Sequence, residues 1–343
     1  MLGLNGLATG IGSLPYDNTA DALDLIFKCV PEIPFWPQLP KRDFREGMLA
    51  QFSQNFPCIK VTPDGIYFDG REQEEGLEKF YENIISNNLE YFRIGPDFAP
   101  GIYDFYNRLK KEDLSRISHI KCHVTGPFTF AAAVKNEKGI ALLHDPIFMQ
   151  VIVKGLVMKA IWQIKFFEKF GKKIIIFIDE PYLACFGSAY TPLNRQDVVK
   201  VLSEFTADLS RQGAATGVHC CGNTDWSIFT DIKALDIINF DAFGFLDKLL
   251  LYAEHLKGFP GDLCWGIVPT QEPANPQTAD SLAEKVIKGV ERLAEKGLDK
   301  GPLLKNMLIS PACGLGSIEA KRAENVFKLL KEVSSLIRSK ATG

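Results

Sequence analysis

The chain has 343 residues, of which 46% are hydrophobic and 24% are charged, and its formal net charge is −3. This composition is typical of a globular protein with a large core, and it gives no reason to expect nucleic acid or a membrane surface as a partner. Apolar runs such as Ile174–Ile178 are too short to span a bilayer. Scattered cysteines and no basic, apolar leader favour a reducing cytoplasm.

Short apolar runs alternate with longer amphipathic stretches along the whole chain. Because eight strands separated by helices are typical of a (β/α)8 TIM barrel, we expect residues 1–343 to form one such barrel domain. The predicted strands are Ala8–Ser13, Ile33–Gln38, Ile120–Thr125, Lys173–Asp179, Ala215–Cys221, Ile237–Asp241, Leu263–Pro269 and Met307–Pro311. The clearest predicted helices are Asp145–Phe170, Asn194–Arg211, Thr278–Lys296 and Ile318–Arg338.

Residues 40–118 are too numerous for one crossover, so we expect an insertion after the second strand. Within it, Cys58–Thr62 and Ile66–Phe68 flank a glycine-containing turn and predict a β-hairpin near the barrel mouth. A helix is expected around Glu72–Ser86. The insertion could be a lid over the mouth or a decorative subdomain, and the sequence leaves both open.

Polar residues follow the predicted strands at their carboxyl ends, which is where TIM barrels place their active sites. We therefore expect their side chains to gather on one rim of the barrel. The residues are Ser13, Gln38, Thr125, Asp179, Glu180, His219, Cys221, Asp241, Thr270, Gln271 and Cys313.

The most specific of these signals is His219 and Cys221, two apart on one strand and therefore facing the same way. Cys313 follows the eighth predicted strand and adds a third soft ligand. Such a set is typical of zinc, with Asp241 as a weaker fourth ligand that an incoming thiol could displace. The zinc would then keep that thiol as a nucleophilic thiolate. The alternative is a closed structural zinc site or plain buried cysteines.

Two consecutive carboxylates, Asp179 and Glu180, end a strand that reads as buried. They are suited to binding an ammonium group or to receiving a proton, and we predict both to be catalytic. Asp179 could instead cap a helix that begins at Pro181. Ser13, in the turn after the first strand, and Gln271, after the seventh, are further substrate-binding candidates.

Several motifs occur in an order that resembles the catalytic domain of cobalamin-independent methionine synthase, over nearly the whole chain. They are Ile11-Gly12-Ser13, Gly126-Pro127-Phe128-Thr129, Ile178-Asp179-Glu180-Pro181, His219-x-Cys221, Asp241 and Pro311-x-Cys313-Gly314-Leu315. The resemblance implies a zinc that activates the thiol of homocysteine for methyl transfer. It also implies that His219, Cys221, Asp241 and Cys313 hold the zinc, that Asp179 holds the substrate's amino group, and that the turn at Ser13 contacts its carboxylate.

The sequence departs from that family in places. The family usually has Glu where this chain has Asp241, and the segment Pro269–Glu272 lacks the family's proton-donating histidine. The segment from His219 to Asn223 is also similar to zinc methyltransferases of the uroporphyrinogen-decarboxylase-like superfamily, which take methyl groups from corrinoid proteins. The donor could therefore be a methyl-corrinoid protein or methyltetrahydrofolate, and the acceptor a small thiol.

Two other functions stay open at this point. Pro34-Phe35-Trp36 followed by Lys41-Arg42 faintly resembles the early segment of uroporphyrinogen decarboxylase, a metal-free enzyme. An enzyme that binds a tetrapyrrole with many carboxylates needs arginines in its cleft, however. The predicted rim instead carries carboxylates and soft ligands such as thiols. A non-catalytic module that binds a corrinoid or zinc is the third possibility.

Overall fold

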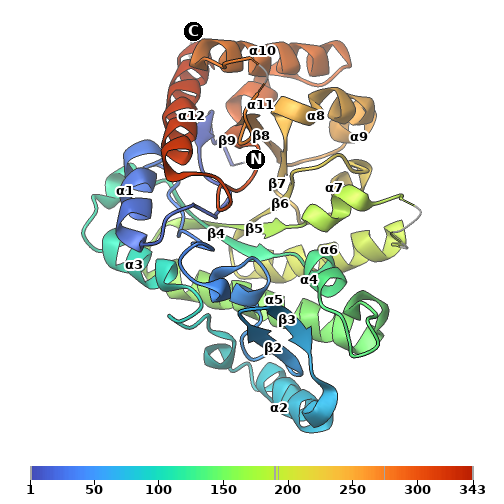
Figure 1. Ribbon diagram of the computed structural model, residues 1–343. Helices are drawn as coiled ribbons and strands as arrows, with labels where there is room; N and C mark the ends of the chain where they lie inside the picture. The colour runs from blue at the N-terminus through green and yellow to red at the C-terminus, as the bar shows by residue number, and fades with distance from the viewer. Residues whose placement is uncertain (1, 189–190, 192, 274, 342–343) are drawn as a thin grey trace.

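The computed structural model describes residues 2–188, 191, 193–273 and 275–341. Seven parallel strands form one curled sheet in the order β1-β9-β8-β7-β6-β5-β4 (Figure 1). Helices surround it, so the α/β fold expected from the alternation is confirmed. The strands are β1 (Leu7–Ala8), β4 (His119–Thr125), β5 (Lys173–Asp179), β6 (Ala215–Cys220), β7 (Ile237–Phe240), β8 (Asp262–Val268) and β9 (Leu308–Pro311).

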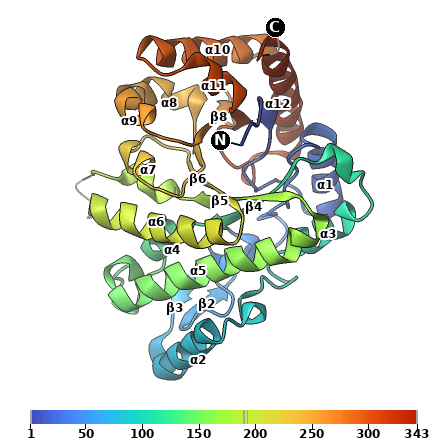
Figure 2. The same ribbon diagram turned by 180° about the vertical axis from the view of Figure 1, so that it is seen from behind.

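The longest helices lie against the outer face of the sheet. Figures 1 and 2 show α5 running beside β4 and β5, and α12 beside β8 and β9, while α6 packs against β6 and α10 against β8. The helices are α1 (Thr19–Cys29), α2 (Gln73–Ile85), α3 (Pro100–Leu109), α4 (Pro127–Ala133), α5 (Pro146–Phe167), α6 (Arg195–Arg211), α7 (Ser227–Thr230), α8 (Ala242–Leu249), α9 (Ala253–Lys257), α10 (Ala279–Glu295), α11 (Lys300–Lys305) and α12 (Ala320–Ala341).

Strand β5 shows why the sheet is buried on both faces. Ile174, Ile176 and Ile178 belong to the large core between the sheet and the helices. Ile175 and Phe177 point the other way, into a smaller core enclosed by the curl of the sheet, together with residues of β7, β8 and β9. Because side chains alternate along a strand, Asp179 lies on this inner face. The inner face therefore carries the functional candidates at its carboxyl end.

The second predicted strand, Ile33–Gln38, is not a strand of the sheet. Pro34 and Pro37 have no N–H to donate, so the segment cannot form a continuous ladder. It makes isolated parallel bridges to both edges of the sheet, Ser13 with Gln38 and Phe35 with Lys121. The eight-stranded barrel that we expected is thus a curled seven-stranded sheet among the described residues, with this segment between its edges.

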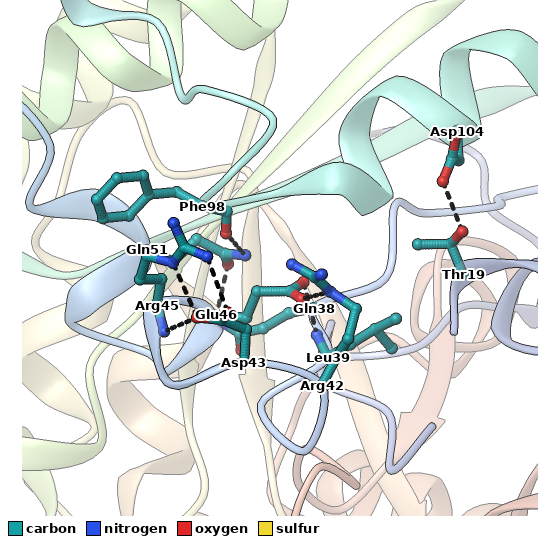
Figure 3. A network of polar contacts seen from close by, with 10 residues as sticks. All are labelled: Thr19, Gln38, Leu39, Arg42, Asp43, Arg45, Glu46, Gln51, Phe98 and Asp104. Carbon is teal, nitrogen blue, oxygen red and sulfur yellow. Dashed lines mark hydrogen bonds and ion pairs between the residues drawn. The ribbon is translucent and has the colours of Figure 1, made fainter. Parts of the chain in front are cut away.

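The insertion continues directly from this segment. Gln38 donates to the Gln51 side chain (2.7 Å), and Gln51 donates to the carbonyl of Phe98 (2.9 Å) (Figure 3). The fully buried Glu46 accepts from the backbone N–H of Leu39 (3.2 Å) and pairs with Arg42. This network fixes the loop that follows the segment against the start of the insertion.

The hairpin expected in the insertion is formed by β2 (Ile59–Thr62) and β3 (Gly65–Phe68), which pair antiparallel. It lies beside α5 rather than on the strand ends, since the Phe68 ring packs against Phe148 of α5 with centroids 4.8 Å apart. An earlier part of the insertion does reach the strand ends, because the Thr125 hydroxyl donates to the carbonyl of Met48 (2.5 Å).

Within the described part of the chain, one helical stretch is long and apolar enough to cross a membrane by length and composition, residues 146–170. Two thirds of its most apolar window, 67%, is buried inside the protein. Its apolar character is therefore explained by its position between the sheet and the insertion, as for the core helix of a globular protein.

Candidate active site

Parallel register places the functional strand ends side by side. Asp179 of β5 is the register partner of His219 of β6, and His219 is the register partner of Asn239 of β7. Partnered residues of adjacent strands face the same side of a sheet, so all three side chains lie on the inner face. Cys221 follows β6 and Cys313 follows β9, at the same carboxyl edge.

The structure brings His219, Cys221 and Cys313 together. One potential ligand atom from each lies within 4.8 Å of the other two. His219 is buried, whereas both cysteines are half-buried, so the group can be approached from the carboxyl edge. One nitrogen and two sulfurs in a compact group match the donors that zinc prefers, with room for a further ligand.

The charges of the three side chains depend on one another. The hydrogen bond from Cys313, and then that from His219, lower the pKa of the Cys221 thiol. The same contact with Cys221, together with burial, raises the pKa of Cys313. Burial lowers the pKa of His219, but its contacts with Cys221 and with Asp179 raise it above the usual value. These contacts favour the thiolate form of Cys221, which is the form that binds a cation.

The structure does not place Asp241 in this group. Its carboxylate caps the amino end of α8, where it accepts from the backbone N–H of Gly244 (2.7 Å). Burial is the main cause that raises the pKa of Asp241. The nearby Cys221 raises this pKa further and His219 lowers it, each by less than burial does. The Asp241 carboxylate is therefore engaged at the end of α8 and is not part of the compact group of the other three side chains.

Asp179 lies beside the group and is almost fully buried, with 9% of its surface exposed. Its Oδ1 has no hydrogen-bond partner among the residues that the structure describes. Burial raises the pKa of Asp179 to about 6, although the charges of Lys121 and His219 oppose this rise. A buried carboxylate oxygen without a partner costs free energy, and a cationic ligand would remove that cost.

Glu180 points away from this site. It is fully buried, and its carboxylate accepts from the backbone N–H groups of Phe128 (2.9 Å) and Thr129 (2.8 Å) and from the Thr129 hydroxyl (2.6 Å). These donors form the first turn of α4, which has no capping side chain of its own. A Cβ at Gly126 would lie 2.1 Å from the Glu180 carboxyl carbon, so only glycine fits there. This geometry gives Glu180 a positioning role and does not support a catalytic one.

Ser13 lies against the loop that carries Cys313. Its hydroxyl accepts from the N–H of Gly316 (3.2 Å), and its carbonyl accepts from the N–H of Leu315 (3.0 Å). A Cβ at Gly314 would be 2.4 Å from the Ser13 hydroxyl oxygen, which explains a glycine next to the cysteine. The turn at Ser13 and the loop of Cys313 are therefore held together.

Gln271 is exposed and lies farther out. With Thr270, Arg322 and Asn325 it lines an open cavity of about 660 Å³ between the loop after β8 and the start of α12. The loop that follows Cys313 forms another wall of this cavity through Ser317. Gln271 therefore lies in the wall of this cavity and not in the group of His219, Cys221 and Cys313.

Two inner-face residues were missed from the sequence. Lys121 of β4 is fully buried, donates to the carbonyl of Ile11, and its Nζ lies 4.6 Å from the centre of the Phe177 ring. Burial lowers the pKa of Lys121 to about 8, although Asp179 opposes this shift. Asn239 hydrogen-bonds to Nδ1 of His219. A polar residue inside an apolar strand was the available signal in both cases.

Comparisons with known proteins agree with this geometry. Among curated proteins, none matches the chain. A family model described as "Cobalamin-independent synthase, Catalytic domain" matches residues 109–335, which is more than half of the chain and includes Asp179, His219, Cys221 and Cys313. The chain therefore belongs to the family of cobalamin-independent synthase catalytic domains and is an enzyme of the methionine-synthase type.

Proposed function

We propose that this protein is a zinc-dependent methyltransferase that moves a methyl group from a methyl-corrinoid or methyltetrahydrofolate donor to a small thiol. The observation that carries the proposal is the compact group of His219, Cys221 and Cys313 at the carboxyl edge of the sheet. The family match supports the reaction class.

The residues present fit zinc. His219, Cys221 and Cys313 would hold the ion through one nitrogen and two sulfurs, which are its preferred ligands. When bound there, zinc lowers the pKa of a thiol in the remaining position and keeps it ionised near neutral pH. Asp241, one methylene shorter than the usual Glu and engaged in its cap, leaves that position open to the substrate.

Asp179 suits a thiol that also carries an ammonium group, such as an amino acid. Its unpartnered Oδ1 would accept from the ammonium group in a site shielded from water. The turn at Ser13, which is tied to the loop of Cys313, would contact the other end of the substrate. These contacts would fix the sulfur relative to the methyl donor, and such alignment is a large part of catalysis in transfer reactions.

In the transfer step, a lone pair of the thiolate sulfur forms the new bond to the methyl carbon. The bond between that carbon and the donor's nitrogen or cobalt breaks, and its electron pair stays with the donor. The open cavity beside Gln271 would admit the donor, whether a folate or a corrinoid on a partner protein.

The proposal is tested by metal analysis of the purified protein followed by methyl transfer from methylcobalamin or methyltetrahydrofolate to a panel of thiols. We expect about one zinc per chain and methylation of a thiol that carries an ammonium group. Bound zinc without transfer to any thiol would favour the non-catalytic module, and absence of metal would favour the decarboxylase.

Substitution of one ligand tests the site itself. Cys313→Ser removes a thiolate from the group, so we expect zinc affinity to fall by more than about 100-fold, since changing an outer contact alone costs roughly 10- to 100-fold. Cys29→Ser is the matched control, because Cys29 is a buried cysteine of α1 outside the group. Equal zinc affinity in the two variants would contradict the assignment.

A further inference from the structure

A chain of hydrogen bonds crosses four neighbouring strands beneath the metal group. Nδ1 of His219 on β6 contacts Oδ1 of Asn239 on β7. The Asn239 amide donates to the carbonyl of Cys264 on β8 (3.1 Å) and to the Ser310 hydroxyl on β9 (2.9 Å). The Ser310 hydroxyl donates to the carbonyl of Pro311 (2.9 Å), two residues before Cys313.

The backbone carbonyls at the end of this chain determine which group donates in every one of its hydrogen bonds. Backbone carbonyls only accept, so the group of Asn239 that faces Cys264 must be its NH₂, and Oδ1 must then face His219. Since an amide oxygen also only accepts, Nδ1 of His219 must carry a hydrogen. The neutral imidazole consequently has its free lone pair on Nε2.

We propose that Asn239 is a positioning residue that sets the tautomer and orientation of His219, so that Nε2 is the metal ligand, and that Ser310 couples this setting to the loop of Cys313. All four members of the chain are buried: His219 is 3% exposed, and Asn239, Cys264 and Ser310 are 0% exposed. Because burial excludes water as a competing partner, the donor and acceptor of each hydrogen bond in the chain are fixed. The inference rests on the proposed function in one respect, that His219 binds a metal.

The first test uses the metal-free protein. Two-dimensional nitrogen–proton spectra of the imidazoles, recorded at alkaline pH where His219 is neutral, should show the Nδ1–H form of His219. Asn239→Leu removes the acceptor at similar volume, and we expect a mixture of tautomers. Asn239→Asp keeps an oxygen toward Nδ1, and we expect it to restore the Nδ1–H form.

The second test measures zinc affinity by competition with a chelator. Asn239→Leu should weaken zinc binding by roughly 10- to 100-fold, which is the usual effect of removing the outer partner of a metal-binding histidine. Thr216→Val is the matched control, because Thr216 lies on the same strand β6 and its buried hydroxyl donates to the carbonyl of Ala234 (2.6 Å), away from His219. We expect this control to leave zinc affinity unchanged.

An Nε2–H form in the wild type, or an unchanged tautomer in Asn239→Leu, would overturn the inference. Equal losses of zinc affinity in Asn239→Leu and Thr216→Val would also overturn it, since the effect would then be general destabilisation. The two proposals fail separately. If the wild type binds no zinc, the proposed function fails, whereas the tautomer spectra still decide the role of Asn239.

Discussion

The two carboxylates at the end of β5 are neighbours in the chain but lie on opposite faces of the sheet. Asp179, on the inner face beside His219 and Cys221, has an oxygen without a hydrogen-bond partner within the described part of the chain. Glu180, on the outer side, accepts three hydrogen bonds from the first turn of α4. Both are buried, so exposure does not distinguish them.

The difference between them is one of satisfied and unsatisfied hydrogen bonding. A buried carboxylate with all its bonds made stabilises the fold, whereas one with an unpartnered oxygen costs stability until a ligand arrives. We therefore propose a structural role for Glu180 and substrate binding for Asp179. The following predictions test this separation, from the largest expected effect to the smallest.

Glu180→Leu should destabilise the protein by about 3 kcal/mol, because it leaves the buried N–H groups of Phe128 and Thr129 without an acceptor. Chemical denaturation, followed by circular dichroism, measures this loss. Glu180→Gln, which keeps one acceptor oxygen, should lose less. A stable Glu180→Leu variant that has lost only activity would reverse the assignment and make Glu180 catalytic.

Asp179→Asn should leave the fold and zinc content intact and reduce kcat/KM by roughly 10- to 100-fold, the range expected when a hydrogen bond to a charged group is weakened. The loss should appear for thiols that carry an ammonium group and be absent for thiols that lack one. Steady-state assays with such a pair of thiols provide the comparison. An equal loss for both thiols would assign Asp179 to the chemistry rather than to the ammonium group.

The pH dependence of the wild type should report Asp179 as well. Burial raises its pKa in the folded protein to about 6, above the ordinary value of 3.8 for an aspartate. Between these two values the folded protein keeps a proton that the unfolded chain has lost, so this group makes stability fall as pH rises from about 4 to about 6. Binding of the ammonium group should strengthen as pH rises through 6. Asp179→Asn should remove both trends, as measured by denaturation and by KM.

Asp241→Ala should have the smallest effect. Loss of the cap of α8 should cost about 1 kcal/mol of stability. Because Asp241 lies outside the group of three ligands, we expect a smaller loss of zinc affinity than in Cys313→Ser. A loss as large as that of Cys313→Ser would show that Asp241 leaves its cap to bind the metal, as the resemblance to the family implies.

Much of the regular structure could be predicted because its signals are local. The run Lys173–Asp179 was predicted with the bounds of β5, and α6 and α10 begin and end within one residue of their predicted ranges. The start of a long periodic helix can be predicted from a polar capping residue, such as Asn194 before α6 and Thr278 before α10.

The contacts that distinguish the roles of the site residues could not be predicted in the same way. Strand alternation places Asp179 and Glu180 on opposite faces, but the partners of Glu180 lie about fifty residues earlier in the chain. The capping of α8 by Asp241 was likewise not expected from the sequence and is seen only in the structure. Ile33–Gln38 had the composition of a strand, yet Pro34 and Pro37 outweighed it.

Those two prolines also affect how the protein fluctuates. The free energy of a local opening depends on the hydrogen bonds and contacts broken, and isolated bridges present fewer bonds than a ladder. The amides of Phe35 and Gln38 should therefore exchange with solvent faster than those in the middle of β5. Since this segment bridges to Ser13, such opening would release the turn at Ser13, whereas β6 and β9, which lead to Cys221 and Cys313, would stay paired within the sheet.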